Sequence, residues 1–183
     1  MSEKYRFDTM SLHSGHVPDK ETGSRAVPIY QTTSYVFKDT DEAAALYNME
    51  VGGHLYTRIS NPTIATLEQR LASLDGGVSC VACSSGMAAM HLVVTAICSS
   101  GDHIVASNKM YGANINLLQH TMTRFGIETE FVNPNNLEEI EKAIKPNTKL
   151  VLWEVIGNPG LDVMNVPEVA KICKKKNVPL AID

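Results

Sequence analysis

From Val78 onward, short apolar segments alternate with amphipathic patterns of helical period, and this alternation constrains the fold more than any other feature of the chain. Strands separated by helices form βαβ units, so the pattern predicts an α/β fold with a mostly parallel sheet covered by helices on its faces. The predicted strands are Val78–Cys83, His103–Ser107, Glu128–Val132, Leu150–Glu154 and Val178–Ile182. The predicted helices are Met87–Cys98, Ala113–Phe125, Leu137–Ile144 and Val166–Lys175.

The first part of the chain, residues 1–61, is rich in turn-forming residues and develops no long periodicity. We predict an N-terminal arm here, with one short helix at Thr40–Met49. Pro62 suits the first position of a helix, and leucines at three- and four-residue spacing continue that helix as far as Gly76-Gly77. Residues 62–183 are therefore predicted to form a separate part of the molecule.

Composition and charge narrow the possible partners. The 183 residues suit one domain, or one domain with an extension. Sixteen basic residues against twenty acidic ones give a net charge of −4, and no basic cluster exceeds Lys174–Lys176, so we expect no nucleic acid partner. No apolar stretch is long enough for a membrane span, and no secretory leader follows Met1. We therefore expect a cytoplasmic protein with a small-molecule ligand.

Ligands of parallel sheets bind outside the carboxyl ends of the strands. This rule directs attention to four places that follow predicted strands: Ser84–Met87, Asn108–Gly112, Gly157–Pro159 and Asp183. At the first, Ser85, Gly86 and Met87 open a predicted helix, where backbone N–H groups could bind a phosphate. The alternative is a serine that caps the helix and binds nothing else.

The other positions also have two interpretations. The Asp183 carboxylate could pair with a protonated ring nitrogen, or it could cap a loop. Tyr111 could stack on a planar ligand or simply pack against its neighbours. Arg58, in the sequence Tyr56-Thr57-Arg58, could bind a phosphate or lie solvated at the surface.

The cysteines and histidines do not indicate a metal site. Cys80 and Cys83 form a C-x-x-C pair, but no second pair follows at the spacing of a zinc site. The six histidines match no metal-binding motif, so we predict no metal.

Several segments together resemble the Cys/Met-metabolism family of pyridoxal-phosphate enzymes, and within it the O-acetylhomoserine sulfhydrylases most closely. The segments cover nearly the whole chain and occur in the family's order. They are Pro28–Tyr35, Tyr56–Thr63, Ser84–Ala89, Gly101–Val105, Tyr111-Gly112, Gly157–Pro159 and Leu180–Asp183.

The resemblance implies a PLP-dependent transferase of fold type I, in which residues 62–183 form the first part of the large cofactor-binding domain. It also implies the residue roles. Ser85, Gly86 and Met87 bind the cofactor phosphate, which Tyr56 and Arg58 reach from a neighbouring subunit of a homotetramer. Tyr111 stacks on the pyridine ring and assists proton transfer, Asn158 approaches the 3-oxygen, and Asp183 keeps the ring nitrogen protonated. Tyr111 and Asp183 are the expected catalytic residues.

The implied reaction is γ-replacement on O-acetylhomoserine by a sulfur nucleophile, in methionine and cysteine biosynthesis. Cystathionine γ-synthase and methionine γ-lyase activities are the alternatives. Ala113-Asn114 stands where sulfhydrylases usually have Gly-Thr and methionine γ-lyases usually have Cys-Thr, so Ala113 argues against a γ-lyase with an active-site cysteine. None of the eleven lysines matches the lysine that forms the Schiff base with the cofactor. We therefore expect a truncated chain, inactive by itself, and a non-catalytic fragment is the rival interpretation.

Overall fold

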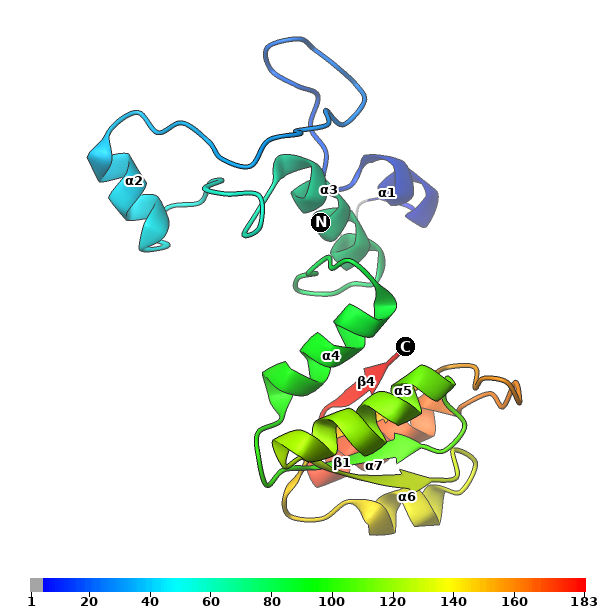
Figure 1. Ribbon diagram of the computed structural model, residues 1–183. Helices are drawn as coiled ribbons and strands as arrows, with labels where there is room; N and C mark the ends of the chain where they lie inside the picture. Colours follow the sequence, from blue (N-terminus) through cyan, green and yellow to red (C-terminus); the bar gives the residue numbers. More distant parts are fainter. Residues whose placement is uncertain (1–4) are drawn as a thin grey trace. The chain divides into compact units, whose positions relative to one another are not determined.

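The computed structural model describes residues 5–183, and its contacts divide the chain into two compact units. The first unit ends at Ala82 and the second comprises residues 83–183 (Figure 1). The sequence predicts a division after Asn61 instead, into an N-terminal arm and a cofactor-binding domain. This functional division stays a prediction.

Within its described residues, 5–82, the first unit contains the helices α1 (Phe7–His13), α2 (Thr40–Tyr47) and α3 (Pro62–Leu74). The α3 helix begins at Pro62 as predicted, because the Asn61 side chain accepts a hydrogen bond from the backbone N–H of Thr63 and so caps the helix. The α1 helix was not predicted. Its following turn is joined to α3 by Arg70, whose Nε donates to the carbonyl of Ser14 at 2.8 Å.

Two segments that carry the family resemblance lie side by side in this unit. Asn61 Nδ2 donates to the carbonyl of Tyr30 at 2.8 Å, and the Thr63 hydroxyl donates to the carbonyl of Pro28 at 2.8 Å. The backbone N–H of Thr57 donates to the carbonyl of Thr33, also at 2.8 Å. These contacts fix the turn that contains Tyr56 and Arg58 against the segment 28–34.

The second unit is an α/β structure with a four-stranded parallel sheet in the order β2-β1-β3-β4 (Figure 1). The strands are β1 (His103–Ser107), β2 (Glu128–Val132), β3 (Thr148–Trp153) and β4 (Leu180–Ile182). The helices are α4 (Gly86–Ile97), α5 (Gly112–Asn116), α6 (Leu137–Ala143) and α7 (Val166–Lys176). The predicted parallel sheet and its covering helices are therefore confirmed.

Alternate residues of the central strands enter two separate hydrophobic cores, one on each face of the sheet. Ile104 of β1 and Leu152 of β3 belong to the core beneath α4 and α5, whereas Val105 and Trp153 belong to the core beneath α6 and α7. This division follows from the two-residue period of a strand. Helices on both faces explain why the runs Ile104–Ala106 of β1 and Leu150–Trp153 of β3 are apolar and buried without alternation.

The segment Val78–Cys83 was predicted to be a strand, and this prediction is wrong for the structure. No residue of the segment is in a strand, and the side chains of Val78 and Val81 are fully or largely exposed. The N–H of Ala82 donates instead to the Glu68 carboxylate at 2.8 Å. A strand requires a partner strand, and within residues 5–183 none lies beside this segment.

The helix predicted at Ala113–Phe125 is a continuous segment in which three types of helix follow one another. The α5 helix passes into a π-helical turn at Leu117–Thr121 and then a 3-10 turn at Met122–Phe125. Gly126, with φ of 75°, ends it in the left-handed conformation that glycine adopts readily.

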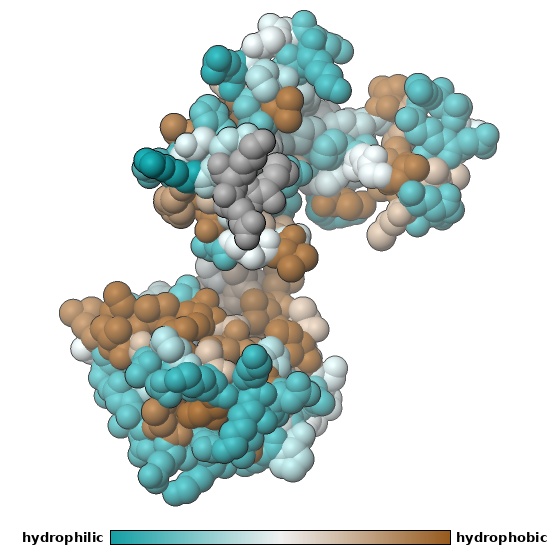
Figure 2. Space-filling view, turned by 180° about the vertical axis from the view of Figure 1, so that it is seen from behind, coloured by the Kyte–Doolittle hydropathy of each residue, from teal (hydrophilic) through white to brown (hydrophobic). Residues whose placement is uncertain are grey.

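Figure 2 shows that the side of the second unit formed by α6 and α7 is hydrophilic, with hydrophobic residues gathered away from it. Ion pairs join these helices, including Lys175 Nζ to Glu141 Oε1 at 2.7 Å. Within residues 5–183 no helix is both long and apolar enough to cross a membrane.

Candidate active site

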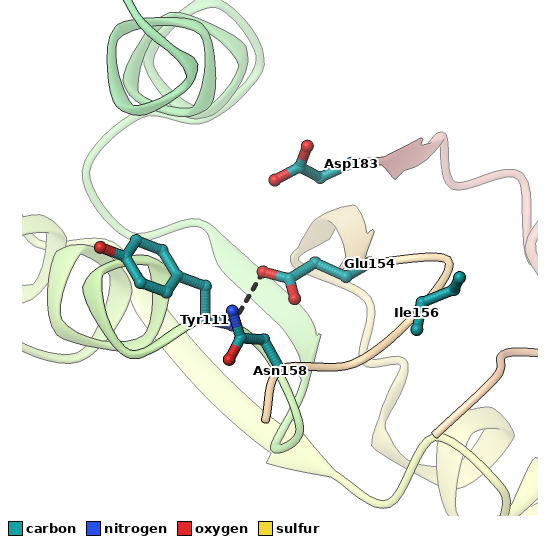
Figure 3. Close-up of a pocket in the computed structure, with 5 residues that line it drawn as sticks. All are labelled: Tyr111, Glu154, Ile156, Asn158 and Asp183. Atoms are coloured by element: carbon teal, nitrogen blue, oxygen red, sulfur yellow. Dashed lines mark hydrogen bonds between the residues drawn. The ribbon is translucent and has the colours of Figure 1, made fainter. Parts of the chain in front are cut away.

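An open hollow of about 420 Å³ lies in the second unit at the carboxyl edge of the sheet (Figure 3). It is lined by Tyr111, Glu154, Ile156, Asn158 and Asp183. Three of these five, Tyr111, Asn158 and Asp183, are sequence-predicted site residues. The structure therefore brings together residues that are far apart in the chain, at the edge where ligands of parallel sheets bind.

Asp183 is held at this edge by the backbone of β3. Its N–H donates to the carbonyl of Trp153 at 2.8 Å, and its carbonyl accepts from the N–H of Val155 at 2.9 Å. These two bonds place Asp183 beside Glu154 in the parallel ladder. Ala181 packs in the core beneath α4 and α5, so the alternation of β4 directs the Asp183 side chain toward the same face.

Glu154 directly follows β3 and is 8% exposed. Its Oε1 accepts a hydrogen bond from the backbone N–H of Tyr111 at 2.8 Å and another from Asn114 Nδ2 at 2.8 Å (Figure 3 marks the first). The residue thereby connects the end of β3 to the beginning of α5. The Tyr111 ring itself is half exposed and lies at the hollow.

Sequence reasoning missed Glu154, Asn114 and Ile156. The signal for Glu154 was present, because a charged residue ends the predicted strand Leu150–Glu154, whose other residues are all apolar. The strand-end rule was applied to Gly157–Pro159, in the loop after the strand, and not to Glu154 itself. Asn114 was noted only as a departure from the family, and no local pattern shows that its side chain is buried at 2% exposure.

Asn158 is placed by close packing of its loop against the loop after β1. Its N–H donates to the carbonyl of Lys109 at 3.0 Å. A Cβ atom on the preceding Gly157 would lie only 2.6 Å from that same carbonyl oxygen. Only glycine permits this approach, which places Asn158 at the hollow together with Tyr111.

The predicted phosphate-binding turn begins α4. The Ser85 hydroxyl accepts a hydrogen bond from the N–H of Ala88 at 3.1 Å, which confirms the capping role. The N–H groups of Gly86 and Met87, in the first turn, have no partner within the helix. A Cβ on Gly86 would meet nothing within 4 Å, so this position at the start of α4 is open. The binding of a phosphate here stays a prediction.

Tyr56 and Arg58 belong to the first unit. The Arg58 guanidinium lies 5.1 Å from the centroid of the Tyr56 ring, and both side chains are exposed. Such stacking orients the guanidinium without occupying its hydrogen-bond donors.

A larger hollow of about 970 Å³ lies in the first unit, between α1, α3 and the segment 76–80. It contains none of the predicted site residues, and its one carboxylate, Glu68, already accepts from Ala82. In the described part of the chain, no group of three or more His, Cys, Asp or Glu side chains is placed to hold a metal ion.

The chemistry of the first hollow suits a planar, partly cationic ligand. The Asp183 carboxylate favours a protonated ring nitrogen, while the exposed tyrosine ring offers a face for stacking and Asn158 offers an amide. These donors and acceptors fit pyridoxal phosphate. The fold and the site together define a PLP-type α/β enzyme architecture.

Comparison with known proteins agrees with this class. The model of the family described as Cys/Met metabolism PLP-dependent enzyme matches residues 8–183. The chain therefore belongs to the Cys/Met-metabolism family of PLP-dependent enzymes.

Relatives with known names cover the whole chain. It is 45% identical over 183 residues to the O-acetyl-L-homoserine sulfhydrylase of Leptospira meyeri, covering all of this chain and 41% of that protein. It is 42% identical over 179 residues to the homocysteine/cysteine synthase of Saccharomyces cerevisiae, covering 97% of this chain and 40% of that protein. The chain thus spans about two fifths of the length of the curated relatives it matches.

Solved structures agree in fold. A Campylobacter jejuni protein described as an O-acetylhomoserine (thiol)-lyase, which carries a pyridoxyl-lysine phosphate group, matches with a TM-score of 0.94 and 37% identity. A cystathionine γ-lyase from Lactobacillus plantarum, in complex with L-serine, matches with a TM-score of 0.88 and 30% identity. Each match covers 98% of this chain and 44% of the other. The predicted fold and cofactor class are confirmed.

Proposed function

We propose that the protein catalyses γ-replacement on O-acetylhomoserine, in which a sulfur nucleophile displaces acetate. With sulfide as the nucleophile, the products are homocysteine and acetate. The observation that carries this proposal is the convergence of Tyr111, Asn158 and Asp183 on one hollow. The identity of 45% to a protein named as an O-acetyl-L-homoserine sulfhydrylase supports the choice of substrate. A small amino-acid ester and a sulfur donor in the cytoplasm are the expected partners.

Pyridoxal phosphate, when bound, supplies an electron sink for the negative charge that develops at the substrate α-carbon. The Asp183 carboxylate would keep a proton on the pyridine nitrogen by charge attraction. The Asn158 amide would donate to the 3-oxygen of the ring. Tyr111 would stack on the ring, and its hydroxyl would move a proton between the substrate carbon atoms and the leaving group.

The phosphate of the cofactor would be bound by Ser85 and by the N–H groups of Gly86 and Met87 at the beginning of α4. Tyr56 and Arg58 would complete the phosphate site of a neighbouring subunit in a homotetramer. Their exposure and the orientation of the guanidinium over the Tyr56 ring support this role. The lysine that binds the cofactor covalently would lie outside this chain, since none of the ten lysines within residues 5–183 lines the hollow and none matches the lysine position that the family resemblance implies.

A second activity has a specific observation in its favour. The likeness to a structure described as a cystathionine γ-lyase supports testing other reactions of the same family. Cystathionine γ-synthase and methionine γ-lyase reactions are therefore the alternatives to test.

The test is an assay of the protein encoded by the whole gene, loaded with pyridoxal phosphate. We expect homocysteine from O-acetylhomoserine plus sulfide, and little product from acylhomoserine plus cysteine or from methionine alone. Faster formation of cystathionine in the second reaction, or of a keto acid and a thiol in the third, would assign the protein to one of the alternatives instead.

A further inference from the structure

Glu154 is the one buried carboxylate at the hollow, and no role has been assigned to it above. Its Oε1 accepts both of its hydrogen bonds, from Tyr111 N–H and from Asn114 Nδ2, each at 2.8 Å. Within residues 5–183 its other oxygen has no hydrogen-bond partner. Glu154 thus has a strong contact to the backbone of the residue that is proposed to stack on the cofactor (Figure 3).

The geometry around Tyr111 shows why this contact matters. Tyr111 precedes α5 and has no side-chain cap hydrogen bond of its own. Its carbonyl accepts from the N–H of Asn114 at 2.9 Å, so the carbonyl is held by the first turn of the helix. Its N–H is held by Glu154 alone. Both peptide groups that flank the Tyr111 Cα are therefore fixed, and the direction in which the side chain leaves the backbone is fixed with them.

Asn114 completes the arrangement. It is 2% exposed, and its side-chain amide donates to the same oxygen that holds Tyr111. A hydrogen bond to a charged acceptor is shorter and stronger than one between neutral groups, so this donor restricts the rotation of the Glu154 carboxylate. This asparagine stands where the family resemblance implies a threonine.

We propose that Glu154 and Asn114 are positioning residues that act through Tyr111: Glu154 holds the Tyr111 backbone, and Asn114 holds the carboxylate of Glu154. The inference rests on the proposed cofactor site, because its consequence is the orientation of the Tyr111 ring against the pyridine ring. It does not depend on which sulfur nucleophile the protein uses.

The test compares Glu154→Leu with Glu154→Gln in the protein encoded by the whole gene. Leucine removes the acceptor, whereas glutamine retains a carbonyl oxygen for both donors. An unsatisfied buried donor weakens an interaction by roughly tenfold or more, so we expect Glu154→Leu to weaken pyridoxal phosphate binding about tenfold in an absorbance titration. The visible circular dichroism of the bound cofactor should also be weaker in Glu154→Leu than in wild type. The affinity of Glu154→Gln for pyridoxal phosphate should stay within about threefold of wild type.

A double-mutant cycle with Tyr111→Ala shows whether Glu154 acts through the tyrosine. In that background we expect Glu154→Leu to have little further effect on cofactor binding. The proposal would be overturned if Glu154→Leu weakened cofactor binding equally in the wild-type and Tyr111→Ala backgrounds. It would also be overturned if Glu154→Leu alone had the cofactor binding and dichroism of wild type. Glu139→Leu is the matched control. The Glu139 carboxylate also accepts a hydrogen bond from a backbone N–H, that of Asn133 at 3.3 Å, but Glu139 does not line the hollow.

Hydrogen exchange gives a readout that needs neither cofactor nor substrate. In the cofactor-free protein, the Tyr111 amide should exchange faster in Glu154→Leu than in wild type, and unchanged exchange would also overturn the proposal. If Glu154→Leu does not fold, Asn114→Ala takes its place. Asn114→Ala should show smaller changes in cofactor affinity, dichroism and Tyr111 amide exchange, and no change in any of the three would overturn the proposal. Failure of the proposed function would appear separately, as no turnover of O-acetylhomoserine by wild-type protein with bound cofactor.

Discussion

Asp183 is fixed by its backbone but is proposed to act by its charge. One hydrogen bond to Trp153 of β3 and one to Val155 beyond the strand hold its main chain, and neither involves the carboxylate. In the protein encoded by the whole gene, Asp183→Asn should therefore keep the shape of the hollow and lose only the anion. We expect exchange of the substrate α-proton for deuterium to slow by about a hundredfold, because a loss of two pKa units in the ring nitrogen corresponds to that factor in rate.

Cofactor occupancy, measured by absorbance, is the control for this experiment. The phosphate site at Ser85–Met87 is unchanged in Asp183→Asn, so the cofactor should still bind. Near wild-type exchange at full occupancy would show that Asp183 only ends the strand and takes no part in the chemistry.

At the scale of elements, the amino-terminal edge of the sheet depends on a buried histidine. His103 begins β1, is 1% exposed, and its Nδ1 lies 2.8 Å from the Thr148 hydroxyl at the start of β3. Burial lowers the pKa of His103, and the positive charge of Lys145, whose Nζ lies 3.4 Å from Nε2, lowers it further. Glu130 and Glu128 oppose these effects.

The lowered pKa makes the stability of this edge depend on pH. The unfolded chain takes up a proton near the ordinary histidine pKa of 6.5, but the folded chain does so only at lower pH. Stability is thus fully present above about pH 6.5 and is lost as the pH falls below it, by at most about 1.4 kcal/mol per pH unit. We expect the free energy of unfolding in urea to fall between pH 7.5 and 5.5, and to fall less in His103→Gln.

The exposed His91 provides a matched control for this prediction. His91→Gln should leave the pH dependence of wild type unchanged. Identical slopes for wild type and His103→Gln would show that other groups cause the loss of stability.

At the scale of the whole molecule, we propose that the site is shared between subunits. Arg58 and Asp183 then serve the same site from different chains. Co-expression of Arg58→Ala with Asp183→Asn should restore activity that neither variant has alone, since one site of each mixed pair contains both wild-type residues. Random pairing should give up to about a quarter of wild-type activity.

Each variant expressed alone is the control, and size-exclusion chromatography should show that the mixed species assembles. No recovery in a mixed assembly would mean that Arg58 serves its own chain, and the shared site would then be rejected.

The sequence by itself determined the elements whose signals are local. The strands β1 and β2 have the bounds that were predicted, and Asn61 and Pro62 mark the start of α3. The strand-end rule also located Tyr111, Asn158 and Asp183, because the carboxyl ends of parallel strands share one edge of the sheet. A motif that is read along the chain is sufficient for these features.

Tertiary structure decided the features that depend on a partner distant in sequence. Residues 78–83 have the composition of a strand but remain unpaired, whereas α1 lacks a capping signal and is joined to α3 through Arg70 and Ser14. The role of Glu154 depends on two donors that lie at least forty residues away in the chain. Hydrogen-bond partners and neighbouring strands are properties of the packed molecule, and no local pattern of residues specifies them.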